Sequence, residues 1–224
     1  MTFPDLPLDD RAVPISFDVH ETALPALLDG VGGEAVAQWL HAVAKTHDAQ
    51  IASLDYVLVT DEYLHAMNVE RLAHDTLTDV ITFDLSEGGT AFIEGECYIS
   101  LPRVLENAGA YGNAAGGHDG AGETPGGVAE GGAVWPPTDP VDHIGTRVPE
   151  DQVRRVDPVN SGGARATPLS PTQGTELLRV IAHGLLHLCG LGDKRPTEAE
   201  KMRAAEDEAL YIWRSRFAPA AELG

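Results

Sequence analysis

The chain has 224 residues, 43% of them hydrophobic, so it is long enough to bury the core of one domain, and its net charge is −20. No run approaches the roughly 20 apolar residues of a membrane-spanning helix, the N-terminus lacks a secretory signal, and two cysteines are too few for a disulfide framework. We therefore expect a reduced, cytoplasmic protein without a membrane partner. The acidic charge disfavours strong non-specific binding to nucleic acid, although it also suits a cytoplasm of very high salt.

Strand and helix patterns alternate along the N-terminal half, after a polar segment at 1–13 that we expect to be a flexible tail. Alternating apolar and polar residues indicate strands, and apolar residues at helical spacing indicate helices. Thr60 is expected to cap one helix, and Pro102 to lie in the first turn of another. The predicted elements are a strand at 14–20, a helix at 35–46, a strand at 51–60, a helix at 61–72, strands at 79–83 and 96–100, and a helix from 102.

The composition changes sharply over 109–174, where glycine and proline supply one third of the residues. Such low complexity without hydrophobic periodicity is typical of a segment that has no packed core. Its polar and aromatic candidates, His118, Trp135 and His143, have no regular spacing, so we assign them no function. We predict a long, disordered surface insertion that interrupts a single catalytic domain, which is formed by 14–108 and 175–217.

Regular structure is expected to return with two C-terminal helices. Apolar residues at helical spacing predict a helix over 175–190 that ends at Gly190. A second helix is predicted from Pro196 to about Arg216, with Thr197 and Glu200 as its capping box. The order of all these elements predicts an α+β fold, in which a mixed β-sheet of about four strands packs against helices.

The first of the two C-terminal helices carries a pattern typical of a metal site. His183 and His187 stand four residues apart, so they share one helix face and lie close enough to bind one ion. A chain reversal at Gly190 then brings Asp193 toward the pair. Two histidines and a carboxylate leave a fourth position for water, which is the open arrangement of a catalytic zinc ion. The same three ligands also suit nickel, cobalt or iron.

Two neighbours of the histidines bear on the chemistry of this site. Cys189 is a rival ligand, but it points to another helix face, and we expect a small buried side chain there. Metallopeptidases of the zincin type place a glutamate directly after the first histidine as general base. Gly184 holds that position in this chain, which weakens the case for peptide hydrolysis.

Three groups of residues stand in the order found in one known family. Residues 183–190 read HGLLHLCG, residues 78–83 read TDVITF shortly after Asn68 and Arg71, and residues 95–100 read GECYIS. These resemble the HGxLHLxG, NxxYR with TDVLSF, and GDIxIS motifs of the YbeY endoribonucleases. The chain differs from that family at 191–193, where Leu-Gly-Asp replaces Tyr-Asp-His, so Asp193 stands at the position of the last histidine ligand.

The resemblance implies a metal-dependent, single-strand-specific endoribonuclease that acts in late 3′-end maturation of small-subunit (16S) rRNA and in ribosome quality control. It implies one Zn²⁺ per chain, with a zinc-bound water as the activated group. The implied partners are ribosomal RNA and the small ribosomal subunit, with ribosome-associated proteins as further candidates.

The resemblance also assigns roles to two residues outside the metal ligands. Arg71 matches the functional arginine of the family, and a guanidinium near the metal would hold a phosphate with two hydrogen bonds. Its alternative role is a surface ion pair with Glu70 or Asp75. Asp79 either orients a ligand from behind or caps a strand, and both readings stay open.

Two alternative functions remain at this point. A zincin-like metallopeptidase would use the same metal chemistry on peptides. A non-catalytic ribosome assembly factor would use the metal only to stabilise its fold, and the charge of −20 favours this second alternative because such a protein would need a partner to approach RNA.

Overall fold

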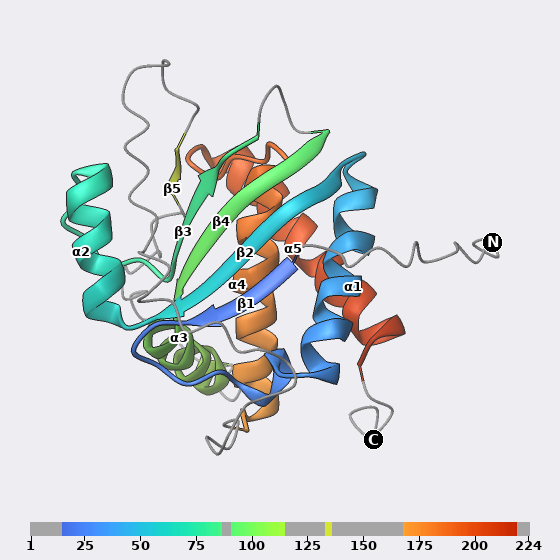
Figure 1. Ribbon diagram of the computed structural model, residues 1–224, viewed down its shortest axis with the longest axis horizontal. Coiled ribbons are helices and arrows are strands. Elements are labelled where there is room, and N and C mark those ends of the chain that lie inside the picture. The colour runs from blue at the N-terminus through green and yellow to red at the C-terminus, as the bar shows by residue number, and fades with distance from the viewer. Residues whose placement is uncertain (1–14, 87–90, 115–132, 136–167, 219–224) are drawn as a thin grey trace.

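The described part of the chain alternates strands and helices in nearly the predicted order. Figure 1 shows the computed structural model, which describes residues 15–86, 91–114, 133–135 and 168–218. The elements are β1 (Ile15–Val19), the short 3-10 helix η1 (Ala26–Leu28), α1 (Val31–Thr46), β2 (Gln50–Val59), α2 (Asp61–Leu72), β3 (Val80–Asp84), β4 (Phe92–Ser100), α3 (Leu101–Ala114), β5 (Ala133–Trp135), α4 (Pro171–Leu188) and α5 (Pro196–Arg216).

The strands form one mixed sheet in the order β1-β2-β4-β3-β5. β2 runs parallel to β1 and β4, β3 is antiparallel to β4, and β5 is parallel to β3. Helices α1, α4 and α5 cover one face of the sheet, and α2 lies against the other (Figure 1). The predicted α+β fold with a mixed sheet is therefore confirmed, and the three-residue β5 adds to the four expected strands.

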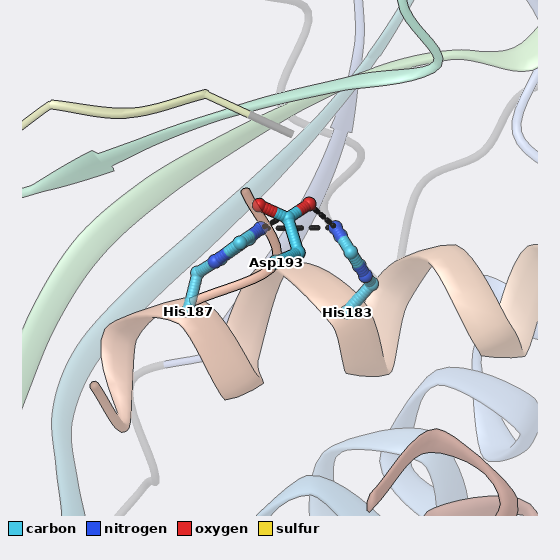
Figure 2. A group of neighbouring side chains, drawn as sticks. All are labelled: His183, His187 and Asp193. Carbon is cyan, nitrogen blue, oxygen red and sulfur yellow. Dashed lines mark hydrogen bonds and ion pairs between the residues drawn. The ribbon is translucent and has the colours of Figure 1, made fainter. Parts of the chain in front are cut away.

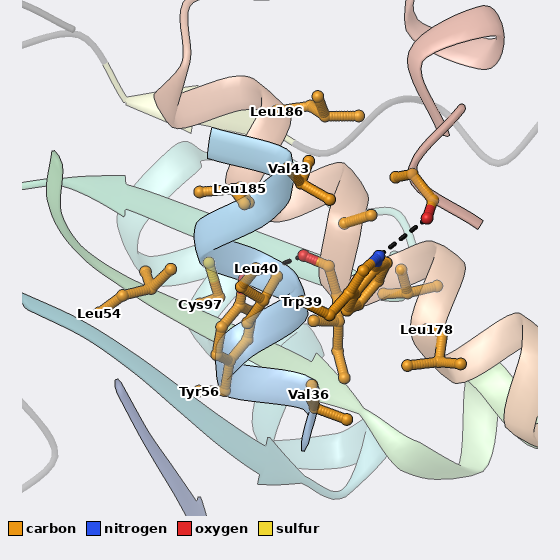
Figure 3. Close-up of a cluster of buried hydrophobic side chains, with 14 of the residues drawn as sticks. Val36, Trp39, Leu40, Val43, Leu54, Tyr56, Cys97, Leu178, Leu185 and Leu186 are labelled. Atoms are coloured by element: carbon orange, nitrogen blue, oxygen red, sulfur yellow. Dashed lines mark hydrogen bonds between the residues drawn. The ribbon is translucent and has the colours of Figure 1, made fainter. Parts of the chain in front are cut away.

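The larger of two hydrophobic clusters lies between the sheet and helices α1, α4 and α5 (Figure 3). Two polar aromatic side chains in it, Trp39 and Tyr56, are fully buried and each donates a hydrogen bond. Trp39 Nε1 donates to the Ala209 carbonyl of α5 at 2.8 Å, and Tyr56 Oη donates to the Ile181 carbonyl of α4 at 3.0 Å. Tyr56 belongs to β2, so this hydrogen bond fixes α4 against the sheet two residues before His183.

The interior of α4 approaches the sheet closely at Gly184. A Cβ atom at this position would lie 2.9 Å from Cys97 Sγ and 3.3 Å from Thr82 Oγ1. Both neighbours belong to the central strands β4 and β3, where no atom has room to move away freely. The glycine therefore allows helix and sheet to meet, and any larger side chain there would push them apart.

Both ends of the predicted insertion 109–174 differ from the expectation. α3 continues to Ala114, β5 lies inside the segment, and α4 begins at Pro171. Ser170 caps α4 by accepting from the Gln173 backbone N–H at 3.3 Å, while the Gln173 side chain accepts from the Ser170 N–H at 2.9 Å. This capping box, followed by proline in the first turn, was readable from the sequence, but the glycine and proline content of the segment obscured it.

The capping box predicted for the last helix was wrong. α5 begins at Pro196, and its first turn is closed by Glu198, whose carboxylate accepts from the Arg195 backbone N–H at 3.1 Å and from the Arg195 side chain at 2.8 Å. By contrast, the cap predicted at Thr60 is confirmed, since its hydroxyl accepts from the Tyr63 N–H at 3.3 Å.

Some of the segments and residues singled out in the sequence lie outside the described residues, and one lies in β5. The tail at 1–13 and the insertion residues 115–132 and 136–167, which include His118 and His143, lie outside the described residues. Trp135 lies in β5, beside Phe83 of β3 in the backbone register. Among the helices that the structure describes, none has the length and apolar character needed to cross a membrane.

Candidate metal centre

The two histidines and the aspartate predicted as ligands lie together at the C-terminal end of α4 (Figure 2). The Nε2 atoms of His183 and His187 are 2.9 Å apart, and Asp193 Oδ2 lies 3.7 Å from each of them. After α4 ends, Gly190 adopts a φ of 89°, a left-handed conformation that reverses the chain and brings Asp193 back over the helix. The predicted spacing thus produces one cluster of three donor atoms.

The geometry of this cluster fits a small metal ion. In a tetrahedral zinc site with bonds of roughly 2.0–2.1 Å, ligand atoms stand about 3.3 Å from one another. The observed separations of 2.9 and 3.7 Å bracket that value, and all three donor atoms converge on one point (Figure 2). Small rotations of the side chains are enough to hold an ion, and the three donors leave a fourth position open.

Each histidine is oriented through its second ring nitrogen. His183 Nδ1 lies 2.8 Å from Glu206 Oε1, and His187 Nδ1 lies 2.8 Å from the Leu191 carbonyl oxygen. A carbonyl only accepts, so the His187 Nδ1 carries the proton and its Nε2 lone pair is free to face the cluster. The Glu206 carboxylate also accepts a hydrogen bond from Nδ1 of His183, so the His183 Nε2 faces the cluster in the same way. Such partners fix the ring orientation and raise the basicity of a metal-binding imidazole.

Glu206 is a functional candidate that the sequence reasoning missed. Its side chain is 9% exposed, and its second oxygen accepts from Arg179 Nη1 at 3.1 Å, which also donates to Asp207 Oδ1 at 3.1 Å. The signal was present in the sequence, because Glu206 stands on the buried stripe of α5 between Met202 and Ala209. A charged residue in an apolar stripe needs a buried partner, and here that partner is a predicted metal ligand.

The protonation of the pair is strongly unequal. Burial opposes the charged form of His183, but the hydrogen bond to Glu206 and the charges of Glu206, Asp79 and Asp193 outweigh it and raise the pKa of His183. Burial and the neighbouring His183 lower the pKa of His187 to about 4. Two imidazoles in contact therefore share one proton easily and resist a second one.

Asp79, expected to act from behind a ligand or to cap a strand, is half-buried and lies directly before β3. Its carboxylate accepts from Asn107 Nδ2 of α3 at 3.5 Å. Burial raises the pKa of Asp79, and the nearby His183 opposes this increase. No described contact joins Asp79 directly to a predicted ligand, so its effect on His183 is electrostatic.

Arg71 does not join the cluster. It lies in the last turn of α2 and lines a pocket of about 440 Å³ together with Ser53, Asp55, Glu94, Glu96 and Tyr98. These strand residues alternate with Leu54, Gly95 and Cys97, which face α4. The sheet therefore lies between Arg71 and the pair His183 and His187, and the expected contact of this arginine with a phosphate stays a prediction.

Cys189 lies beside the cluster without belonging to it. It is the C-cap residue of α4, and burial raises the pKa of its thiol to about 12. The thiol is thus a poor source of the thiolate that metals prefer. This agrees with its expected role as a small, mostly buried side chain.

The chain is similar to a described protein family and to several curated proteins. A family model described as "Endoribonuclease YbeY" matches residues 32–118. Three curated relatives, each named "Endoribonuclease YbeY", come from Amoebophilus asiaticus, Cytophaga hutchinsonii and Flavobacterium johnsoniae. The first is 43% identical over 81% of this chain and 82% of its own length, and the second is 33% identical over 79% and 82%. The third is 29% identical over 80% and 86%. The match to two relatives above 30% identity over most of both chains shows that this chain belongs to the YbeY endoribonuclease family.

Proposed function

We propose that this protein is a metal-dependent endoribonuclease that cuts single-stranded RNA in the cytoplasm, during late 3′-end maturation of small-subunit (16S) rRNA and ribosome quality control. The observation that carries the proposal is the cluster of His183, His187 and Asp193, which presents three converging donor atoms in a chain of the YbeY endoribonuclease family. Ribosomal RNA, the small subunit and ribosome-associated proteins are the proposed partners.

The donor set favours zinc as the bound ion, at one per chain. A zinc ion in an open three-ligand site supplies Lewis acidity and lowers the pKa of a coordinated water to about 7. The residues of the chain supply the ligand atoms and hold them in position. His183 and His187 offer neutral Nε2 lone pairs, Asp193 supplies a negative charge, and Glu206 and the Leu191 carbonyl prevent the two rings from rotating away.

Peptide hydrolysis is disfavoured by the surroundings of Gly184. A glutamate there, as zincin-type peptidases require, would place its Cβ within 3 Å of Cys97 Sγ. The position faces the sheet rather than the cluster, so the general base of that mechanism has no room. The glycine is needed for packing between α4 and the sheet.

The proposal is tested by incubating the protein with a short single-stranded RNA, alone and after chelation, beside the variants His187→Ala and Asp193→Asn. His74→Ala is a matched control, because His74 is exposed on the loop after α2. We expect cleavage by the wild type and the control, and a loss of about a thousandfold in the two ligand variants. Intact RNA in every sample, with stoichiometric metal in the wild type, would instead support an assembly factor with a structural metal. Digestion of casein would support the peptidase.

A further inference from the structure

A second pocket opens beside the metal cluster, between the N-terminal half of α4 and the first turns of α5. It has a volume of about 570 Å³, and its polar lining consists of Thr172, Thr175, Glu176, Arg179, Arg203 and Glu206. Glu206 is shared with the cluster, because it also contacts His183. The pocket and the proposed metal site are therefore neighbours that meet at one buried carboxylate.

The face of α4 that carries the histidines continues directly into this pocket. Arg179 precedes His183 by four residues and Glu176 precedes it by seven, so all three lie along one stripe of the helix. Seven residues correspond to about 10 Å along the helix axis. The distance suits a single nucleotide, whose phosphate would lie at the cluster while its base enters the pocket.

Glu176 has acceptor capacity that the protein leaves unused. Its side chain is only 12% exposed, and its one described contact is an ion pair at 3.9 Å with Arg179 Nε, which is too long for a hydrogen bond. Among the described residues none donates a hydrogen bond to this carboxylate. A mostly buried carboxylate without donors is costly, and it is ready to accept N–H groups from a ligand.

Arg203 lies on the opposite wall of the pocket, which α5 forms. The side chain is exposed on α5, and within the described residues it forms no hydrogen bond or ion pair. Arg179, in contrast, is held by Glu206 and Asp207. A planar guanidinium that is not engaged elsewhere can stack on a nucleobase.

The charges favour a base over a phosphate in this pocket. In the lining, Glu176 and Glu206 balance the charges of Arg179 and Arg203. Asp207 pairs with Arg179 from outside the lining, and the chain as a whole carries −20, so a second phosphate would be repelled. A base edge is neutral, and the edge of guanine offers two adjacent N–H donors that match the two oxygens of one carboxylate. Uracil offers one N–H between two carbonyl oxygens, which a carboxylate repels.

We propose that this pocket binds the base of the nucleotide next to the bond that is cut, and that Glu176 selects guanine there while Arg203 stacks on the ring. The proposal rests on the ribonuclease function proposed above and adds a sequence preference to it. Adenine and cytosine would each offer only one amino group to Glu176, so they would bind less well than guanine.

The test uses single-stranded oligonucleotides of uridine that contain one guanosine, one adenosine, one cytidine or none. We expect the wild type to cut at one fixed position beside the guanosine, roughly tenfold faster than any bond in the uridine-only strand. Glu176→Gln replaces one acceptor oxygen by a donor, so it should remove this preference while metal content is kept. Glu208→Gln, an exposed change on α5 outside the pocket, should keep it.

The outcomes separate the two proposals. Cleavage of every strand without a preference for guanosine, or an unchanged preference in Glu176→Gln, would overturn the pocket assignment and leave the ribonuclease standing. Absence of cleavage in all strands would overturn the ribonuclease itself. Arg203→Ala gives a second test, since it should weaken binding of the guanosine strand to the inactive His187→Ala protein but not that of the uridine strand.

Discussion

The two faces of the sheet carry two different kinds of polar site. On the α4 face, His183, His187 and Asp193 are almost enclosed, and Glu206 and the Leu191 carbonyl hold the two rings from behind. On the α2 face, Arg71 stands among carboxylates in an open pocket. The first arrangement is preorganised for one small cation, whereas the second is a solvated surface. The three predicted metal ligands therefore lie on the α4 face, whereas Arg71 lies on the α2 face.

Acidification tests how the two histidines divide their protons. A metal needs both Nε2 atoms unprotonated, and only His183 has a raised pKa, while that of His187 is lowered to about 4. Below the pKa of His183, zinc binding must displace one proton from this ring. We therefore expect zinc affinity to fall about tenfold for each pH unit in that range. The dissociation constant should be measured between pH 8 and 5. A fall of a hundredfold per unit would mean that both rings titrate together.

The largest effect of a residue outside the three ligands is expected at Glu206. In Glu206→Gln the hydrogen bond to His183 loses its charge, so zinc should bind about 10–100-fold more weakly. Competition with a chromophoric chelator measures the change, and Glu208→Gln is the exposed control on the same helix. Unchanged affinity would show that His183 does not depend on this carboxylate.

Packing behind the cluster is probed at Gly184. The variant Gly184→Ala adds a methyl group against Cys97 and Thr82, and we expect it to destabilise the fold by about 1–3 kcal/mol. Denaturant unfolding of the metal-free protein measures the loss. Gly109→Ala is the control, because nothing lies within 4 Å of its added Cβ atom. Equal effects of the two changes would contradict the close approach of α4 to the sheet.

The smallest effect on the metal is expected at Arg71, on the opposite face. Arg71→Ala should leave zinc content unchanged. If the arginine contacts RNA there, KM should rise about tenfold, the equivalent of one charged hydrogen bond, with kcat within a fewfold of the wild type. Loss of zinc, or a large fall in kcat alone, would place Arg71 in the chemistry after all.

The sequence predicted that His183, His187 and Asp193 would lie together, because the geometry of this group is local. Histidines four residues apart on a helix, followed by a glycine turn, determine where the aspartate arrives, without knowledge of the rest of the fold. The fold class was also predictable from periodicity. The position of Arg71 was not, because it depends on which face of the sheet α2 covers, and this follows from the order of strands rather than from any local pattern.

Glu206 and the start of α4 were missed for different reasons. The role of Glu206 appears only when α5 packs against α4, since 23 residues separate it from His183. The start of α4 was marked by Ser170, Pro171 and Gln173, but those residues stand at the end of a glycine-rich and proline-rich segment. Helix-capping residues that stand next to a low-complexity segment are easily counted as part of that segment.

The most direct test of a catalytic metal at the α4 cluster is a zinc titration of the chelated protein in the presence of excess single-stranded RNA. We predict that the cleavage rate rises in proportion to added zinc and saturates at one equivalent per chain, and that His187→Ala shows no rise. A rate that does not depend on the metal, or an equal rise in His187→Ala, would contradict the claim that the α4 cluster is the catalytic centre.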